Sequence, residues 1–281
     1  MDEKYDLTIL QMNDSHAYLD LHDEYFWKDG EQRYREVGGY ARITSYLDRV
    51  RGENPGSVLS LDNGDTIHGT FPVVKDEGEN MIPILNKMGF DAWTAHWDFA
   101  YGPDHLIETA DKLDYPLLAM NCYHEDTDEL VFDPYDIVEK NGLKIGLIGI
   151  ANTIVDKTMP DHFSEGVYLT LGNKELPRYI DELRRDKGVD IIVVFAHLGY
   201  PQEVKLAEEV DGIDVLISGH THNRLYEPVE VNDTIIIQSG CHGYFIGRLD
   251  LKIDDKIKDY QHELVEIGKD IEPDDEVQGM V

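Results

Sequence analysis

Five short apolar runs each end in a cluster of potential metal ligands, and this feature most constrains the fold. The runs and the residues that close them read ILQMNDSH, LSLDNGD, WTAHWD, VVFAHLG and LISGHTH. In α/β folds, functional residues gather just beyond the carboxyl ends of the strands. A single histidine after a strand is usually structural, but five such clusters together predict one shared metal site.

Apolar runs that alternate with amphipathic stretches predict an α/β domain. We expect strands at residues 7–11, 57–61, 92–95, 117–120, 144–150, 190–196, 215–218, 234–238 and 246–253. Because no helical pattern separates the last two of these strands, we expect the chain to end in antiparallel strands. Helical spacing indicates helices at 40–50, 106–113 and 176–183. Residues 18–35 and 124–136 lack clear periodicity, so we interpret them as surface loops.

The balance of charge excludes several classes of partner. The 57 acidic and 25 basic side chains give a formal net charge of −32 at pH 7. This charge repels phosphate backbones and anionic lipid surfaces, so we expect neither a nucleic-acid polymer nor a membrane as partner. An anionic substrate would then need local positive charge, which bound metal ions would supply.

The start of the chain and the cysteines bear on the compartment. The opening MDEKYDLTIL is acidic where a signal peptide is basic, and no apolar run approaches the length of a membrane span. We therefore expect the chain as given in the cytoplasm, or in the periplasm or outside the cell if a signal was removed. Cys122 and Cys241 form no CxxC motif and are interpreted as buried small residues.

Two pairs of candidate ligands have the same spacing. Asp14 and His16 stand two residues apart, as do His220 and His222. In an extended segment such a pair shares one face and can bind one cation. For Asp14 the alternative is a turn that closes the strand.

The LDNGD segment offers two carboxylates. Asp65 follows Gly64 just past a strand, where a carboxylate can bridge two cations and lower their mutual repulsion. Asp62 could instead orient the loop by accepting hydrogen bonds. We expect Asp65 to be the bridging ligand.

The chemistry of these ligands narrows the choice of metal. Imidazoles and carboxylates without thiolates suit manganese, iron or zinc better than magnesium or calcium. About seven candidate ligands exceed the needs of one ion, so we expect two divalent metal ions, with manganese favoured. Two ions about 3.5 to 4 Å apart can clamp a phosphoryl group and hold a bridging hydroxide for in-line attack.

Four motifs, in order, resemble those of the calcineurin-like metallophosphoesterases, and most closely those of the catalytic domain of the 5′-nucleotidase family. They are NDSH at 13–16, GD at 64–65, AHLG at 196–199 and GHTH at 219–222. The resemblance implies a four-layer αββα sandwich of two mixed β-sheets flanked by helices. It also implies a first metal bound by Asp14, His16, Asp65 and His222, and a second bound by Asp65, His197 and His220.

One motif departs from the family. In the family, the asparagine of the G-N-H-E motif is a metal ligand. The histidine that follows it stabilises the transition state or protonates the leaving oxygen, and an aspartate three residues after this histidine orients it. Aligned on Phe99, the asparagine becomes His96, and the dyad positions become Trp97 and Ala100. A neutral imidazole can replace the amide, so we expect His96 as a ligand. Without the dyad, we expect the reaction to lose the rate enhancement of roughly 10²- to 10⁴-fold that a general acid contributes.

These features predict a dinuclear hydrolase of small-molecule phosphate esters, including nucleotides, with Asp65 and His96 as the catalytic residues. A similar His-Trp motif occurs in SoxB-like thiosulfohydrolases, so hydrolysis of a sulfur-linked sulfonate is one alternative. A metal-binding protein with impaired catalysis is another.

Three further side chains are expected to contact the substrate: Trp97, His68 and His242. The competing interpretations are core packing for Trp97 and loop hydrogen bonds for the two histidines. We expect three tyrosines to line the opening of the metal site: Tyr123, Tyr200 and Tyr244. The remaining histidines are interpreted as surface residues: His22, His105, His124, His162 and His262.

The resemblance also bears on domain organisation. In the 5′-nucleotidase family a C-terminal domain supplies the aromatic rings that stack on the nucleotide. We expect residues 1–281 to form a single catalytic domain, with the start of the linker helix near 272–281 and the nucleotide-binding domain absent.

Overall fold

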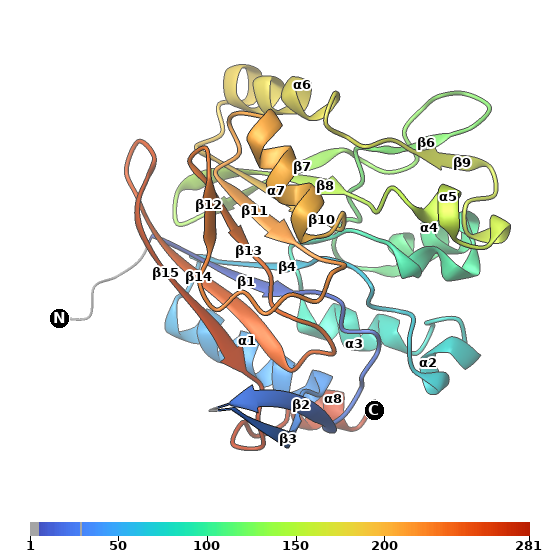
Figure 1. The fold of residues 1–281 in the computed structure, drawn as a ribbon, viewed down its shortest axis with the longest axis vertical. Coiled ribbons are helices and arrows are strands. Elements are labelled where there is room, and N and C mark those ends of the chain that lie inside the picture. The colour runs from blue at the N-terminus through green and yellow to red at the C-terminus, as the bar shows by residue number, and fades with distance from the viewer. Residues whose placement is uncertain (1–5, 29) are drawn as a thin grey trace.

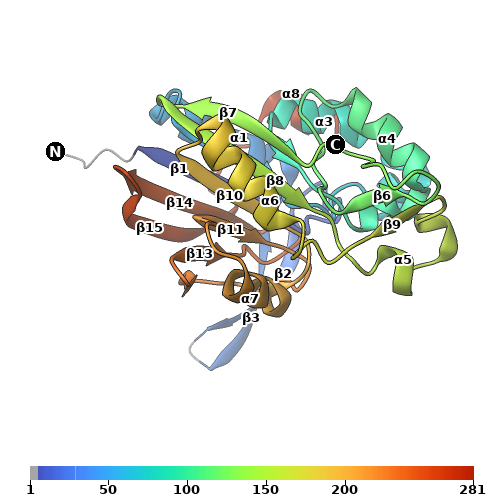
Figure 2. The same ribbon diagram turned by 90° about the horizontal axis from the view of Figure 1, so that it is seen from above.

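Two mixed β-sheets form the centre of the fold (Figures 1 and 2). The computed structural model describes residues 6–28 and 30–281, so the first five residues of the acidic start lie outside the described range. The strands are β1 (Leu7–Met12), β2 (His22–Lys28), β3 (Glu31–Val37), β4 (Val58–Asp62), β5 (Ala92–Trp93), β6 (Cys122–His124), β7 (Tyr135–Lys140), β8 (Leu143–Ile150), β9 (Val167–Leu169), β10 (Ile191–Ala196), β11 (Val215–Ser218), β12 (Val229–Val231), β13 (Thr234–Ile237), β14 (Phe245–Ile253) and β15 (Ile257–Glu266).

Short helices connect and cover the strands. They are α1 (Tyr40–Glu53), α2 (Phe71–Lys75), α3 (Met81–Met88), α4 (Pro103–Lys112), α5 (Val155–Thr158), α6 (Leu176–Asp181), α7 (Tyr200–Glu209) and α8 (Asp275–Gln278). Two 3₁₀ helices, η1 (Trp97–Tyr101) and η2 (Asp161–Phe163), and a π-helical segment, η3 (Glu182–Lys187), complete the set. The three predicted helices correspond to α1, α4 and the continuous stretch of α6 and η3.

The first large sheet is parallel in one half and antiparallel in the other, and the second is parallel at its centre and antiparallel at both edges. The first sheet has the order β15-β14-β1-β4-β5, with β1, β4 and β5 parallel. The second has the order β12-β13-β11-β10-β8-β7, with β13, β11, β10 and β8 parallel. Parallel strands share the edge at which they end, so the carboxyl ends of β1, β4 and β5 lie together, as do those of β10 and β11.

Alternation along the buried strands produces the layers. On β10, Val193 and Phe195 pack in a core with residues of the first sheet such as Leu59, whereas Val194 packs with Leu206 of α7. On β1, Leu10 packs instead in the core that contains α1 and α3. Successive side chains of a strand point to opposite faces, so each sheet is covered by the other sheet on one face and by helices on the other. The predicted four-layer αββα sandwich is confirmed.

Three details of the predicted secondary structure and topology are wrong. Residues 18–35 are not all loop, because β2 and β3 pair there as a hairpin that projects from the body of the molecule (Figure 2). The predicted strand at 117–120 is reduced to isolated bridges at Leu117 and Leu118. The last two predicted strands, β13 and β14, lie in different sheets, and the antiparallel pair at the end of the chain is β14 with β15.

Both cysteines are buried and free, as predicted. Within residues 6–28 and 30–281, no helix combines the length and the apolar character that crossing a membrane requires.

Candidate metal centre

The loops after five parallel strands meet at one place between the two sheets. Gln11 donates from Nε2 to the carbonyl of Ser218 at 2.7 Å, which ties β1 to the end of β11. Asn63 donates from Nδ2 to the carbonyls of Ala196 at 3.0 Å and Ile217 at 2.8 Å, which ties the loop after β4 to β10 and β11. These side-chain bonds align the strand ends of the two sheets, so the predicted ligands converge.

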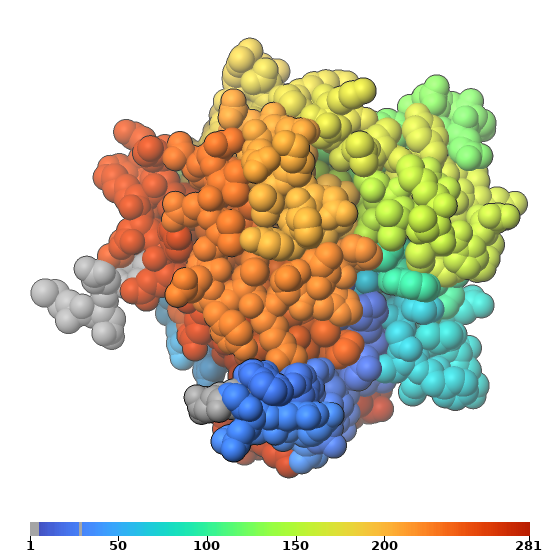
Figure 3. Space-filling view, in the orientation of Figure 1, coloured from blue at the N-terminus to red at the C-terminus, as the bar shows by residue number. Residues whose placement is uncertain are grey.

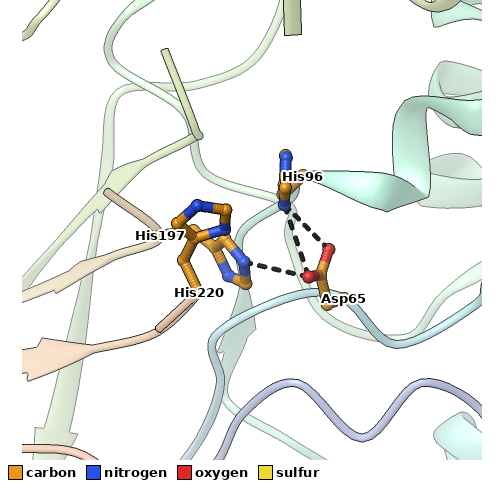
Figure 4. A group of neighbouring side chains, drawn as sticks. All are labelled: Asp65, His96, His197 and His220. Carbon is orange, nitrogen blue, oxygen red and sulfur yellow. Dashed lines mark hydrogen bonds and ion pairs between the residues drawn. The ribbon is translucent and has the colours of Figure 1, made fainter. Parts of the chain in front are cut away.

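One group of potential ligands consists of Asp65, His96, His197 and His220, whose ligand atoms all lie within 4.8 Å of one another (Figure 4). Nδ1 of His96 lies 3.2 Å from Oδ1 of Asp65, and Nε2 of His197 lies 3.2 Å from Oδ2. All but His220 are fully buried. Imidazole nitrogens and a carboxylate at this spacing can bind one transition-metal ion.

A second group consists of Asp14, His16, Asp65 and His222, again with ligand atoms within 4.8 Å. Nε2 of His222 lies 3.2 Å from Oδ1 of Asp14, and Nε2 of His16 lies 3.5 Å from Oδ2 of Asp65. Asp65 therefore belongs to both groups. A carboxylate shared in this way can bridge two cations and reduce their repulsion.

The backbone is strained at these positions. Six residues have left-handed φ angles of 48° to 72°: Asp14, His16, Asp65, His220, His222 and His242. This conformation costs roughly 1–2 kcal/mol for a residue other than glycine. Such outliers gather where function constrains the backbone, so their concentration here is independent evidence for a site.

The orientation of His197 fits a metal ligand. Its Nδ1 donates to the carbonyl of Asn63, which leaves Nε2 to face Asp65 and Asp14. Among the residues that the structure describes, Nε2 has no hydrogen-bond partner, although it is buried. A backbone carbonyl that fixes the tautomer in this way is typical of metal-binding histidines.

Charges inside the centre shift its pKa values strongly. Burial lowers the pKa of His197, but the carboxylates of Asp65 and Asp14 outweigh it and raise the pKa to about 10. Burial raises the pKa of Asp65, but His197 and His96 hold it well below its usual value. Burial and the neighbouring His197 and His96 lower the pKa of His220 to about 4. These opposed shifts describe a compact cluster in which cations can replace protons.

A buried aspartate from η1 holds the loop of Asp65. Asp98 is fully buried, and its two carboxylate oxygens accept hydrogen bonds from the backbone N–H groups of Asp65, Thr66 and Ile67 at 2.9 to 3.0 Å. It also accepts from the N–H of His96 at 3.1 Å. Asp98 thus fixes the backbone of both expected catalytic residues at once.

Asp98→Ala should destabilise the fold strongly. The substitution leaves four buried N–H donors without a partner, and each such group costs about 1–3 kcal/mol. We expect the free energy of unfolding of the metal-free protein to fall by about 3 kcal/mol or more, measured by urea denaturation. Asp98→Asn keeps one acceptor oxygen and should lose less. Equal stability of Asp98→Ala and the wild type would contradict the anchoring role.

Two other buried acids support the loops. Asp62 is in neither group, and its carboxylate accepts from Oγ1 of Thr66 at 2.8 Å, in line with its interpretation as a loop-orienting acceptor. Glu203, on α7, accepts from the N–H groups of Leu198 and Gly199 and so holds the loop after His197. Burial raises the pKa of each of these carboxyl groups to about 8. The role of Glu203 was not predicted, because an acidic residue in the first turn of a helix is common and nothing in the sequence links it to the loop after His197.

The expected substrate contacts lie around the centre. Trp97 donates from its backbone N–H to Oδ1 of Asp65 at 2.7 Å, and its ring stacks on His68 with centroids 5.1 Å apart. Trp97 also contacts Phe163 edge to face, so the ring is partly packed. His242 lies with its ring 6.0 Å from those of His16 and His222.

Two interpretations of the surroundings are wrong. Tyr244 is only 1% exposed and packs in the core under the β2–β3 hairpin, so it does not line the opening of the metal site. His22 is not an isolated surface residue, because it groups with Glu24 and His242 within ligand distance. Glu24 was missed because it lies in a segment without clear periodicity.

The chain is similar to several known proteins. The calcineurin-like phosphoesterase family matches residues 7–224. A probable 5′-nucleotidase of Treponema pallidum is 29% identical over 221 residues, which cover 78% of this chain and 37% of the relative. A 5′-nucleotidase of Vibrio cholerae is 27% identical and is matched over 89% of this chain and 49% of its own length. The chain thus spans about half the length of these curated relatives or less.

Solved structures support the fold. A sulfate thiohydrolase SoxB of Thermus thermophilus superposes with a TM-score of 0.91 at 21% identity, covering 100% of this chain and 60% of that one. A 5′-nucleotidase precursor from Thermus thermophilus superposes with a TM-score of 0.83 at 24% identity, covering 98% of this chain and 57% of that one. At these identities the likeness supports the fold alone.

Proposed function

The chain belongs to the calcineurin-like phosphoesterase family, and from this premise we propose that it is a metal-dependent hydrolase of small-molecule phosphate esters. The observation that carries the proposal is the pair of ligand groups that share Asp65. We propose two divalent ions in these groups, with manganese favoured because the ligands are imidazoles and carboxylates.

Each side chain of the centre would have a distinct task. Asp65 would face both ions, with one oxygen toward His96 and the other toward His197. His197, held by Asn63, would present Nε2, and Asp98 would keep the loops of Asp65 and His96 in register. When bound, two divalent ions would neutralise phosphoryl charge and lower the pKa of water.

The substrate class follows from the surroundings and from the relatives. The matched curated relatives are named 5′-nucleotidases, which favours nucleotides as substrates. We propose that the chain lacks the family's acid dyad, because Trp97 and Ala100 stand at its positions and neither can donate a proton from a titrating side chain. Esters whose leaving group needs no proton should then be the better substrates.

A second candidate is hydrolysis of a sulfur-linked sulfonate. It is favoured by Trp97, whose ring stacks on His68 beside His96 and gives the centre an apolar wall. The superposition on the sulfate thiohydrolase SoxB is compatible with this candidate. A third candidate is a metal-binding protein without catalytic activity.

One panel of substrates separates the three. The manganese-loaded protein would be offered an aryl phosphate, AMP and a cysteine S-sulfonate, and release of phosphate or sulfate would be measured. We expect the aryl phosphate to turn over at least roughly 10²-fold faster than AMP, because an aryl leaving group needs little help from an acid. Turnover of the S-sulfonate alone would favour the second candidate. Two bound ions with no turnover of any compound would favour the third.

A further inference from the structure

We infer that a third divalent transition-metal ion binds beside the metal centre, on Nε2 of His22, Oε2 of Glu24 and Nδ1 of His242. The three residues each offer a ligand atom within 4.8 Å of the other two. None of them belongs to the two groups that share Asp65, and the inference does not depend on the proposed reaction.

The β2–β3 hairpin delivers two of these ligands. Alternate residues of a strand face the same side, and along β2 the inner face carries His22, Glu24 and the buried Phe26. The outer face carries exposed residues such as Trp27. Phe26 packs with Tyr244 and thereby holds the hairpin against the loop of His242. In Figure 3 the blue hairpin lies directly against the orange surface of the later segments.

The distances suit one ion. Oε2 of Glu24 accepts a hydrogen bond from Nδ1 of His242 at 3.0 Å and lies 3.9 Å from Nε2 of His22. A bound ion would replace the proton that Nδ1 carries in this hydrogen bond. Metal–ligand bonds of about 2.0 to 2.2 Å allow two ligand atoms of one ion to lie up to about 4.4 Å apart. Both pairs fall inside this limit, and the ligand atoms of His22 and His242 lie within 4.8 Å of each other, so a small shift of the side chains suffices to bind a cation.

His22 carries the most specific signal. Its Nδ1 lies 3.2 Å from the carbonyl of Asp20, which can only accept, so this nitrogen donates. In the neutral ring the remaining nitrogen, Nε2, then carries a lone pair. This nitrogen is buried and has no hydrogen-bond partner within the part of the chain that the structure describes. A lone pair that faces a carboxylate oxygen is stabilised by a cation between them.

The other two ligands are also held in place. Arg224 donates to Oε1 of Glu24 at 3.4 Å, which leaves Oε2 for the two imidazoles. The ring of Tyr18 stacks on His242 with centroids 4.1 Å apart and contacts His22 at 4.6 Å. His242 has a left-handed φ of 52°, and its backbone N–H donates to the carbonyl of Asp14 at 2.7 Å.

Two imidazoles and one carboxylate select the class of metal. This set suits zinc, iron, cobalt or manganese rather than calcium or magnesium, which prefer oxygen ligands. Three protein ligands leave positions open for water or for an oxygen of an anionic ligand. Because the rings of His16 and His222 lie 6.0 Å from that of His242, the third ion would add positive charge at the side of the metal centre.

The test is metal stoichiometry of the full chain. Protein stripped with a chelator would be titrated with Zn²⁺, dialysed and measured by elemental analysis. We expect three equivalents in the wild type and one fewer in His22→Gln and in Glu24→Gln. The control His262→Gln, which changes a half-buried histidine outside all ligand groups, should keep the wild-type value. Circular dichroism of each variant checks the fold.

A second readout separates this site from the centre around Asp65. With Co²⁺ in place of Zn²⁺, the visible spectrum of the wild type minus that of His22→Gln should show the absorption of one ion. Asp65→Asn should retain the third ion, even if the proposed hydrolysis is wrong. The inference is overturned if folded His22→Gln and Glu24→Gln variants bind as much metal as the wild type, or if folded Asp65→Asn binds none.

Discussion

Asp65→Asn is expected to lower the metal content by two equivalents and to abolish hydrolysis. The carboxylate has one oxygen 3.2 Å from His96 and the other 3.2 Å from His197, and it also belongs to the group of His16. An amide offers a single oxygen and no charge to offset two cations. Losing several kcal/mol of charge stabilisation corresponds to a fall in turnover on the order of 10³-fold or more.

The matched control is Asp250→Asn. Asp250 is also mostly buried, but it lies on β14, where it accepts a hydrogen bond from Thr8 and pairs with Arg248, outside both ligand groups. Its substitution should change stability without changing metal content. If Asp65→Asn kept the stoichiometry of the wild type while remaining folded, the shared-carboxylate centre would be wrong.

Much of the arrangement of the candidate centre could be predicted because several of its potential ligands stand close together in the sequence. Asp14 and His16, like His220 and His222, stand two residues apart directly after a strand, so the strand pattern alone brings them to a sheet edge. Only the meeting of two different sheets depended on the family resemblance. The buried strands were equally predictable, since their apolar runs are short and regular.

The parts that could not be predicted depend on distant contacts. Asp98 holds residues 31 to 33 positions before it, and its own segment shows nothing beyond a capping acid. The pairing of Glu24 with His242 spans 218 positions. The sequence predicts a loop in place of the β2–β3 hairpin because the hairpin's outer face is aromatic and exposed, as with Trp27 at 66%, so apolar and polar residues do not alternate.

The 3₁₀ helix η1 makes the proposed loss of the acid dyad testable. In a 3₁₀ helix, residues three apart lie one above the other, so Trp97 and Ala100 of η1 share a face. A histidine and an aspartate at these positions would therefore be neighbours. Ala100 is only 8% exposed, so the new aspartate would be largely shielded from water and would depend on the histidine for a partner.

Trp97→His combined with Ala100→Asp should raise turnover of alkyl phosphates by up to roughly 10²- to 10⁴-fold, the range expected of a general acid. Turnover of an aryl phosphate should change little, because its leaving group departs without a proton. A change in metal content or in the folded fraction affects both rates equally, so it cancels when the alkyl phosphate rate is divided by the aryl phosphate rate. Trp97→His alone has no aspartate to orient its ring and should gain less, while Ala100→Asp alone should gain nothing. If the ratio stays at the wild-type value in the double variant, Trp97 serves only to pack against His68 and Phe163, and the acid must come from elsewhere.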